Sequence, residues 1–354
     1  MKIRTVTFFK ENNSGAVLQA YALSHYLALL GNDVEILNYD PFWSGRIKDS
    51  NSLKDRVKAV LLYPHHKNVG RKYRLFRENF LSMTPIVRSV EDIEELSDCD
   101  VYIAGSDQIW NPYLLGCMDD IFFLNFTTNA KKMSYAASYG RDDFSEEYLK
   151  KVARLTSDYS SISVRENNFK TALNPLVGQD VECVSDPVFL LNAEEYRRIK
   201  KEPKLSGYLL IYTKSYTDDI WEYARYIARK RNLKIVDTSK IFKKKGVNFV
   251  RANIGPEDFL GLIDGADFVL TNSFHGTAFS IILEKNFYAL SAGAANARIE
   301  SLLEHLDLKD RQIIKGANFE ISDIDYNKIA QQRLKYTGMA RSFLEKSLLG
   351  LRDN

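Results

Sequence analysis

The N-terminal segment alternates between a strand, a helix and a second strand, and this order constrains the fold more than any other feature. Apolar residues have strand spacing over Ile3 to Phe9, helical spacing over Ala16 to Leu30, and strand spacing again over Val34 to Tyr39. Gly31 is placed to end the helix. Such a βαβ unit requires a parallel sheet and a right-handed crossover. The sequence therefore predicts a Rossmann-like α/β fold.

The same alternation continues along the chain and restarts in its second half. At 354 residues the chain is longer than most single cores grow, which favours two domains with a cleft. The turn dipeptide Asp186-Pro187 lies near the expected boundary. We expect Rossmann-like domains over residues 1–186 and 187–324, and a C-terminal helix over residues 325–354 that packs back on the first domain. Further strands are expected at 100–104, 132–139, 161–164, 181–184, 208–212, 234–236, 268–270 and 287–290.

Composition excludes several classes of protein. Hydrophobic residues make up 45% and charged residues 27%, which is typical of a folded globular chain. With 49 basic and 46 acidic residues the net charge is +3, so we expect no nucleic-acid partner. The widely spaced Cys99, Cys117 and Cys183 give neither a zinc pattern nor a disulfide framework, so we expect no metal. The N-terminus lacks a signal-peptide core and no long apolar run follows, which together with the cysteines favours a cytoplasmic protein.

A basic segment extends from about Ser44 to Ser82, and its aromatic residues fall at helical spacing. A solvated amphipathic helix is the favoured interpretation. The alternative is attraction to an acidic glycan or to anionic lipid, as a peripheral contact at the inner face of the membrane.

One histidine lies where a strand is followed directly by a helix. The apolar run 268–270 is followed by polar residues 271–277, which contain His275, and then by an apolar helical run. A helix start offers unpaired N–H groups and a positive dipole end, which stabilise a phosphate or a carboxylate. Imidazole titrates near neutral pH, so His275 beside such an anion is a candidate for proton transfer. The alternative is a histidine that only caps or packs.

Other expected strand ends also carry polar residues. Gly15 lies in a turn without the dinucleotide fingerprint, so it contacts a polar ligand or simply makes a tight turn. Ser106 and Asp107 follow an apolar strand, where they orient a ligand hydroxyl or close a turn through their own backbone. Arg165 also follows a strand directly, and it binds a carboxylate or phosphate or forms a salt bridge with Glu166.

Several short motifs, taken in order, resemble those of the polysaccharide pyruvyl transferase family, and they span nearly the whole chain. The motifs are NSGAVLQ at 13–19, GSDQIWN at 105–111, SYAASYG at 134–140, SVRE at 163–166, SDPVFLL at 185–191 and NSFHGT at 272–277.

This resemblance implies a glycosyltransferase B-like architecture, in which two Rossmann-like domains face a cleft. It implies phosphoenolpyruvate as the donor co-substrate, with no further cofactor. The acceptor would be a hexose of a capsule polysaccharide or exopolysaccharide, or of its lipid-linked precursor. The product would be a pyruvyl ketal, formed with release of phosphate.

The resemblance also assigns roles to individual residues. His275 would donate the proton that the enol carbon must gain, and Asp107 would share the duty of base. The N–H groups of Gly276 and Thr277 would suit the donor's phosphate, and Arg165 its carboxylate or phosphate.

The chain departs from part of the family at the histidine turn. Some characterised members resemble Arg-Leu-His there, whereas this chain has Ser273 at the position of the arginine, and Ser273 is assigned to the donor with its neighbours. Arg298 is the candidate that substitutes for the missing cation, with Lys214 and Arg251 as weaker candidates.

The remaining candidate residues of these motifs belong to the first domain. The resemblance implies that this domain binds the acceptor. Asn13, Gly15 and Ser106 are assigned there, to the acceptor or to cleft closure. Two other functions stay open: a glycosyltransferase of the same architecture with a nucleotide-sugar donor, and a non-catalytic sugar-binding protein. The presence of both His275 and Arg165 argues against the non-catalytic alternative.

Overall fold

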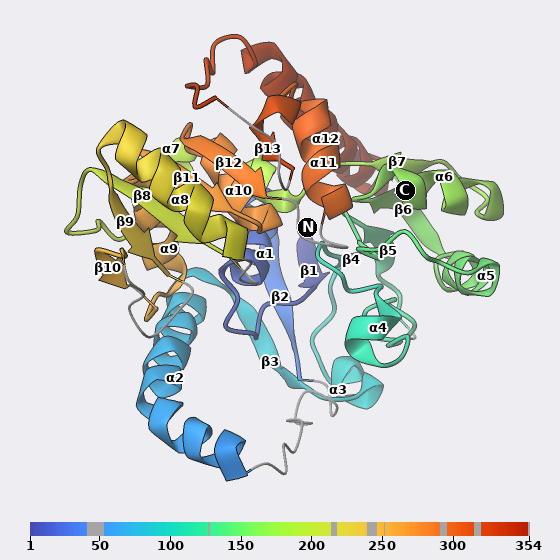
Figure 1. Ribbon diagram of the computed structural model, residues 1–354. Helices are drawn as coiled ribbons and strands as arrows, with labels where there is room; N and C mark the ends of the chain where they lie inside the picture. The colour runs from blue at the N-terminus through green and yellow to red at the C-terminus, as the bar shows by residue number, and fades with distance from the viewer. Residues whose placement is uncertain are drawn as a thin grey trace. The chain divides into compact units, whose positions relative to one another are not determined.

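The computed structural model describes residues 1–40, 53–126, 128–213, 218–238, 246–250, 252–290, 296–314 and 320–352. It divides into two compact units. The first unit contains Met1–Leu190 and Gly338–Asn354, and the second contains Leu191–Thr337 (Figure 1). The division falls after Leu190, beyond the Asp186-Pro187 turn that marks the expected boundary. The reason is local, because the short helix η3 (Pro187–Leu190) is fully buried and packs against the first helix of the chain.

The first unit contains a seven-stranded parallel sheet with the order β3-β2-β1-β4-β5-β6-β7. The strand order reverses between β1 and β4, and in such sheets this switch point is where ligands bind, outside the carboxyl ends of the strands. The strands are β1 (Lys2–Val6), β2 (Asp33–Tyr39), β3 (Met83–Val87), β4 (Val101–Ala104), β5 (Lys131–Ser134), β6 (Tyr159–Val164) and β7 (Val181–Cys183).

The second unit repeats this pattern with a six-stranded parallel sheet, in the order β10-β9-β8-β11-β12-β13. Its switch point lies between β8 and β11. The strands are β8 (Tyr208–Tyr212), β9 (Lys234–Asp237), β10 (Phe249–Val250), β11 (Phe268–Thr271), β12 (Asn286–Leu290) and β13 (Gln312–Ile313). The chain is therefore an α/β protein with two Rossmann-like units, as the sequence predicts.

Helices follow most strands, as a parallel sheet requires. In the first unit α1 (Ser14–Leu29) is deeply buried, since Leu18, Gln19 and Ala22 are all fully enclosed. The other helices of this unit are α2 (Leu53–Phe80), α3 (Val90–Glu94), α4 (Pro112–Leu115), α5 (Glu146–Leu155) and α6 (Asn167–Leu173). The second unit contains α7 (Ala193–Ile199), α8 (Asp218–Arg231), α9 (Pro256–Asp264), α10 (Phe274–Ile282) and α11 (Asn296–His305), and α12 (Ala330–Arg352) follows them.

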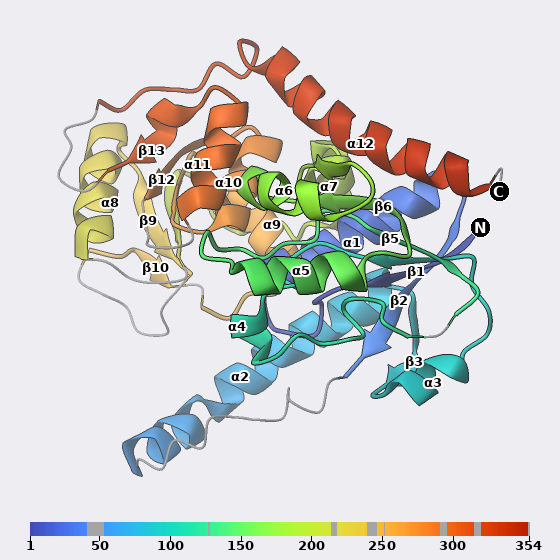
Figure 2. The ribbon, with the colours of Figure 1, turned by 90° about the vertical axis from the view of Figure 1, so that its right-hand side faces the viewer.

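The C-terminal helix α12 begins in the second unit and ends in the first (Figure 2). Near its start, Arg333 pairs with Glu284 of the second unit at 2.6 Å. Further along, Tyr26 of the first unit donates a hydrogen bond to Glu345 at 2.6 Å. The expected return of the last helix to the first domain is therefore present.

The basic segment forms much of α2, and its described part is amphipathic. Tyr73 and Phe76 are buried, and Phe76 lies edge-on to Tyr21 of α1 with 6.0 Å between ring centres. Arg71 and Arg74 are exposed. Tyr73 and Phe76 of this helix thus belong to the core of the first unit.

None of the described helices is both long and apolar enough to span a lipid bilayer.

Candidate active site

The carboxyl ends of β1 and β4 are tied together at the switch point of the first sheet. Thr7, which follows β1, donates through its hydroxyl to the carbonyl of Ser106, which follows β4, at 2.7 Å. The amide nitrogen of Gln19 in α1 donates to Thr7 Oγ1 at 2.9 Å and to the carbonyl of Phe8 at 3.1 Å. The switch point is therefore built from polar groups that hold both strand ends in place.

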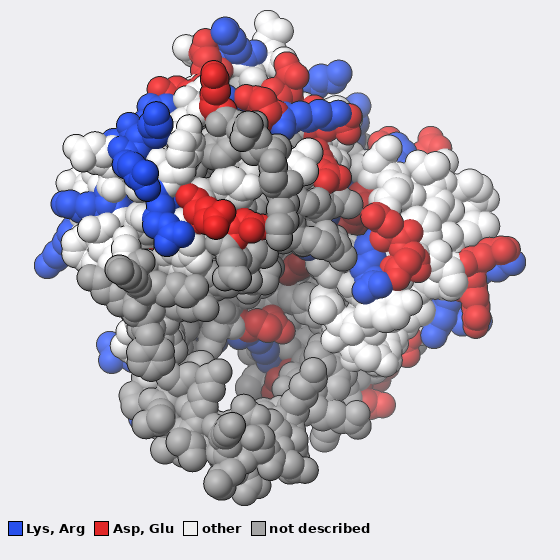
Figure 3. Space-filling model, viewed as in Figure 1, with Lys and Arg blue, Asp and Glu red and all other residues white. Residues whose placement is uncertain are grey.

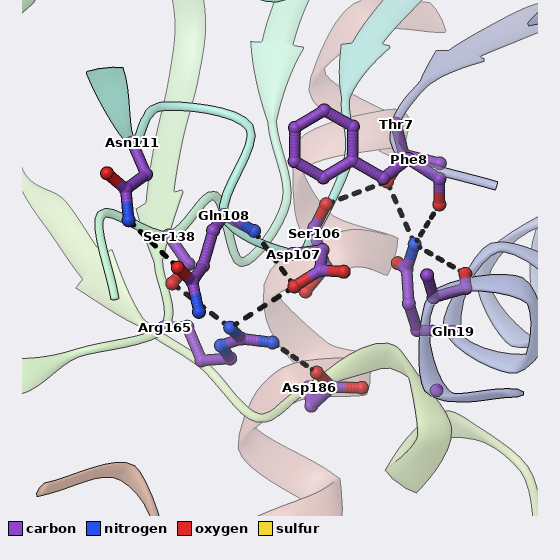
Figure 4. Close-up of polar contacts among 12 residues, drawn as sticks. Thr7, Phe8, Gln19, Ser106, Asp107, Gln108, Asn111, Ser138, Arg165 and Asp186 are labelled. Atoms are coloured by element: carbon purple, nitrogen blue, oxygen red, sulfur yellow. Dashed lines mark hydrogen bonds and ion pairs between the residues drawn. The ribbon is translucent and has the colours of Figure 1, made fainter. Parts of the chain in front are cut away.

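Arg165 lies beside this point in a group of carboxylates (Figure 4). Its Nη1 contacts Asp186 Oδ2 at 2.6 Å, and its Nη2 donates to Ser138 Oγ at 3.0 Å. Two further acids are close, with Asp107 Oδ1 at 3.8 Å from Nη2 and Glu166 Oε1 at 3.6 Å from Nε. We call Asp107, Glu166 and Asp186 around Arg165 the acid cluster.

The acid cluster holds three carboxylates against one guanidinium. Burial alone would lower the pKa of Arg165, but the carboxylates of Asp186, Glu166 and Asp107 outweigh it and raise that pKa above its usual value. An anionic ligand placed at Arg165 would meet this surplus of negative charge. Arg165 does form the salt bridge with Glu166 that the sequence offered as the alternative to binding a carboxylate or phosphate. Its role in binding the donor stays a prediction.

Asp107 has an unusual backbone for a residue with a side chain. Its φ is +68°, in the left-handed region, and Ala136 at the end of the neighbouring β5 has φ +51°. Asp107 Oδ1 accepts a hydrogen bond from the N–H of Gln108 at 2.9 Å, which stabilises this turn. Strained backbone held in place by its surroundings is typical of functional sites.

Several buried oxygens near the acid cluster lack a hydrogen-bond partner within the described part of the chain. They are Gln19 Oε1, Ser106 Oγ and Glu166 Oε2. Figure 4 shows Gln19 and Ser106 beside Asp107. A buried acceptor without a donor costs about 1–3 kcal/mol, so such groups call for a water or ligand donor. Hydroxyl groups of a sugar would supply donors of this kind.

The histidine turn lies at the switch point of the second sheet, where β11 is followed directly by α10. His275 is buried, with 3% of its surface exposed, and its ring lies edge-on to that of Phe274. Ser273 caps the helix, because its Oγ accepts from the N–H of Gly276 at 3.4 Å. This cap gives a local reason for a serine at the position of the arginine.

Both N–H groups predicted to bind phosphate have partners at this helix start. Gly276 donates to Ser273 Oγ, and Thr277 donates to the carbonyl of Ser273 at 2.9 Å. An anion at Gly276 would have to displace the serine hydroxyl. The assignment of Ser273, Gly276 and Thr277 to the donor stays a prediction.

Gly276 is required by packing against the strand. A Cβ atom there would lie 2.2 Å from Thr271 Oγ1 and 3.0 Å from Tyr212 Cδ1. The start of α10 therefore lies directly on the ends of β11 and β8, which fixes the place of His275.

The structure brings Arg298 to the same turn. Its guanidinium carbon lies 5.8 Å from the ring centre of Phe274, the residue before His275. The two weaker candidates, Lys214 and Arg251, lie outside the described residues.

A comparison with known protein families identifies the family of this chain. A family model for polysaccharide pyruvyl transferases matches residues 13–293, which is most of the chain. The chain belongs to the polysaccharide pyruvyl transferase family. The match includes the acid cluster and the histidine turn, and it confirms the resemblance carried by the sequence motifs. A comparison with curated proteins gives no match.

Solved structures show how this family member folds. UDP-GlcNAc 2-epimerase from Methanocaldococcus jannaschii has a TM-score of 0.51 at 11% identity, over 95% of this chain and 93% of the epimerase. UDP-GlcNAc 2-epimerase from Neisseria meningitidis has a TM-score of 0.49 at 12% identity, over 99% and 100% of the two chains. At 11% identity the likeness to the Methanocaldococcus epimerase shows the fold alone, which is glycosyltransferase B-like with two Rossmann-like units.

The family's first motif forms the start of α1. Asn13 Oδ1 accepts from the N–H of Gly15 at 3.1 Å and so caps the helix, and Ser14 Oγ lies 2.7 Å from Tyr73 Oη. Gly15 is the second residue of α1, so it lies in the first turn of the helix and not in a turn before it. The assignment of Asn13 and Gly15 to the acceptor side stays a prediction.

Among the described residues, no group of three or more His, Cys, Asp or Glu side chains is arranged to hold a metal ion.

Sequence reasoning placed Glu166 and Asp186 in motifs of the family but gave them no role at the site. Their signal was present, because each acid lies two residues after a short expected strand. The sequence does not show that Asp186 lies close to Arg165. The two residues meet because β6 and β7 pair in parallel. Gln19 was overlooked because it lies within an apolar helix.

Proposed function

We propose that this protein transfers the enolpyruvyl group of phosphoenolpyruvate to two hydroxyl groups of a hexose, giving a pyruvyl ketal. Membership of the polysaccharide pyruvyl transferase family, with a histidine retained at the second switch point, is the observation that carries the proposal. The acceptor is a surface polysaccharide, such as a capsule or exopolysaccharide, or its lipid-linked precursor. Phosphoenolpyruvate is a co-substrate, and the proposal needs no further cofactor.

The overall reaction balances without an oxidant or reductant. C3 of phosphoenolpyruvate gains one proton and becomes a methyl group. C2 forms bonds to two sugar oxygens and loses its bond to the phosphate oxygen. Of the two hydroxyl protons released, one balances the proton taken up by C3 and the other leaves with hydrogen phosphate.

In this mechanism His275 donates the proton to C3, which gives C2 the character of an oxocarbenium ion that a hydroxyl attacks. Its burial at a helix start keeps bulk water away from the transfer. The helix dipole and the nearby Arg298 favour an anion at this turn, so we assign the donor to the second unit.

The acid cluster is assigned to the acceptor. Carboxylates accept hydrogen bonds from sugar hydroxyls and take protons from them, whereas the surplus of negative charge disfavours a second anion. Asp107 is the proposed base, because its side chain is 14% exposed whereas that of Asp186 is fully buried. In this proposal Arg165 holds the carboxylates in position, in place of the donor-binding role that the family resemblance implies.

The proposal is tested by incubating the purified protein with phosphoenolpyruvate and a panel of free and lipid-linked hexosides. We expect release of inorganic phosphate together with a product whose mass shows an added pyruvyl ketal. Consumption of a nucleotide sugar without phosphate release from phosphoenolpyruvate would make the protein a glycosyltransferase. Sugar binding without turnover of either donor would make it a non-catalytic protein.

A further inference from the structure

The segments that follow β4 and β5 also line a cavity of about 490 Å³ that the acid cluster does not use. Small-molecule sites have volumes of about 300–1,000 Å³. We call this cavity the tyrosine pocket. It is lined by Pro112, Tyr113, Gly116, Tyr139, Ser145 and Tyr148. Of these described residues none is charged, so the pocket offers aromatic faces and hydroxyl groups.

The ring of Tyr113 is both exposed and held in place. It is 63% exposed, although it is a large aromatic residue. The guanidinium carbon of Arg141 lies 4.6 Å from its ring centre, as in a cation–π pair. Arg141 is fixed in turn by Asp143, whose Oδ1 accepts from Nε at 2.6 Å while Oδ2 pairs with Nη2. Such a ring forms a binding platform that loses little freedom when a ligand covers it.

The other two tyrosines form a rigid wall. Tyr139 is 2% exposed and its ring centre lies 4.8 Å from that of Tyr148. Tyr148 donates through its hydroxyl to the carbonyl of Trp110 at 2.5 Å. Burial, with the neighbouring Tyr113, raises the pKa of Tyr139 to about 12. The phenol of Tyr139 is neutral at physiological pH, as an ordinary tyrosine is, and it donates to the carbonyl of Asp143 at 3.5 Å.

The tyrosine pocket shares its chain segments with the acid cluster. Tyr139 directly follows Ser138, whose hydroxyl accepts from Arg165. Asn111 caps α4 and donates to Gln108 Oε1 at 2.8 Å, and Gln108 follows Asp107. Figure 3 shows an uncharged surface over α4 that is bordered by basic and acidic side chains. A ligand in the pocket is thus held by the same loops that place the acids.

We propose that the tyrosine pocket binds a hexose residue of the acceptor saccharide, with its ring stacked on Tyr113. One face of a pyranose carries mainly C–H groups, which pack on the electron-rich face of an aromatic ring. Its hydroxyl groups meet the exposed hydroxyl of Ser145, which also accepts from the N–H of Tyr148 at 3.1 Å. The identity of this sugar as the acceptor rests on the proposed function, whereas binding of a hexose does not.

Direct binding without any donor tests the tyrosine pocket. Methyl glycosides of glucose, galactose and mannose are offered one at a time, and saturation-transfer NMR gives the dissociation constant. We expect the wild type to bind at least one of them, and Tyr113→Ala to weaken that binding at least about tenfold, which corresponds to about 1.4 kcal/mol. Tyr113→Phe keeps the ring and should bind within about threefold of the wild type.

Leu114→Ala is the matched control, because Leu114 is the next residue of α4, is 59% exposed and does not line the pocket. This variant should bind as the wild type does. The proposal is overturned if the wild type binds none of the three sugars, or if Tyr113→Ala binds as tightly as the wild type. Because phosphoenolpyruvate is absent, a protein that fails the phosphate-release assay still gives a clear result here.

Discussion

The two switch points share a strand order but differ in charge. In the first unit the carboxylates of Asp107, Glu166 and Asp186 surround a single guanidinium, that of Arg165. In the second unit the turn after β11 places His275 at a helix start whose polar groups include hydroxyls and backbone N–H groups.

The two units share a fold, so the difference in charge comes from the few residues that follow the strands at each switch point. An excess of carboxylates attracts hydroxyl donors and repels anions. A helix start attracts an anion, and a histidine beside it can donate a proton to that anion. Variants that alter one switch point at a time test whether the two have different roles.

The largest expected effect is loss of stability at the acid cluster. Asp186→Asn removes the closest partner of the buried Arg165 guanidinium, so we expect the free energy of unfolding to fall by about 3 kcal/mol in urea denaturation. Asp158→Asn is the control, because Asp158 pairs with Lys132 at 2.7 Å in the same unit but is 56% exposed. That exposed pair should contribute about 1 kcal/mol or less. Equal losses in the two variants would show that the acid cluster does not hold the first unit together.

The second effect is loss of turnover at the histidine turn. His275→Ala should reduce phosphate release by at least about a hundredfold, the scale of a general acid. His305→Ala is the control, because His305 lies exposed on α11 in the same unit. Near-wild-type turnover in the first variant would remove His275 from the mechanism and leave the second switch point without its proposed role.

A smaller loss of turnover is expected at Asp107. Asparagine tolerates the left-handed backbone that Asp107 adopts, so Asp107→Asn removes the charge and keeps the turn. We expect turnover to fall roughly tenfold, because Glu166 and Asp186 leave two carboxylates nearby. Asp98→Asn, at an exposed acid of the same unit, should have no effect. If Asp107→Asn instead weakens only the binding of phosphoenolpyruvate, the donor belongs to the first unit.

The smallest effect is expected at Asp264 of the second unit. There one carboxylate contacts two cations, whereas in the acid cluster one cation contacts three carboxylates. Asp264 is shared by Lys200 at 2.6 Å and Arg197 at 3.2 Å. Burial would raise the pKa of Asp264, but its hydrogen bond to Lys200 and the charge of Arg197 outweigh it and lower that pKa. We expect Asp264→Asn to reduce the free energy of unfolding by about 1 kcal/mol at pH 7.

The pH dependence of this loss follows from the lowered pKa. The carboxylate stabilises the fold fully above its unfolded pKa of about 3.9, and the stabilisation disappears as the pH falls through the lower folded pKa. The difference between Asp264→Asn and the wild type should therefore be constant from pH 7 to about pH 5 and shrink below pH 4. Glu202→Gln is the control, since Glu202 contacts the same Lys200 but is 73% exposed. A loss that does not change with pH would contradict the ion pair.

All interior strands could be predicted from the sequence, whereas of the edge strands only β7 could. Runs such as 268–270 are apolar because both faces of a parallel sheet are covered. The strands without a prediction are β3, β10 and β13, and each lies at an edge of its sheet. Two of them, Phe249–Val250 and Gln312–Ile313, are too short to carry a pattern and exist only because a neighbour pairs with them.

For the site, the sequence indicated which strand ends carry polar residues but not which side chains meet there. His275 and Asp107 are recognisable because each lies in the polar segment that follows an apolar strand. The pairing of Arg165 with Asp186 depends on strand register, and the tyrosine pocket combines residues from separate loops. Contacts of this kind are set by tertiary packing, which a local pattern does not contain.

The path of α12 has a consequence for how the protein is made. The first unit includes Gly338–Asn354, which are synthesised after the whole of the second unit, and Leu344 and Leu348 among them are buried. During synthesis the second unit can complete its sheet before the first unit receives this helix. The first unit must therefore wait for these residues of α12, with part of its apolar surface uncovered, while the second unit is synthesised.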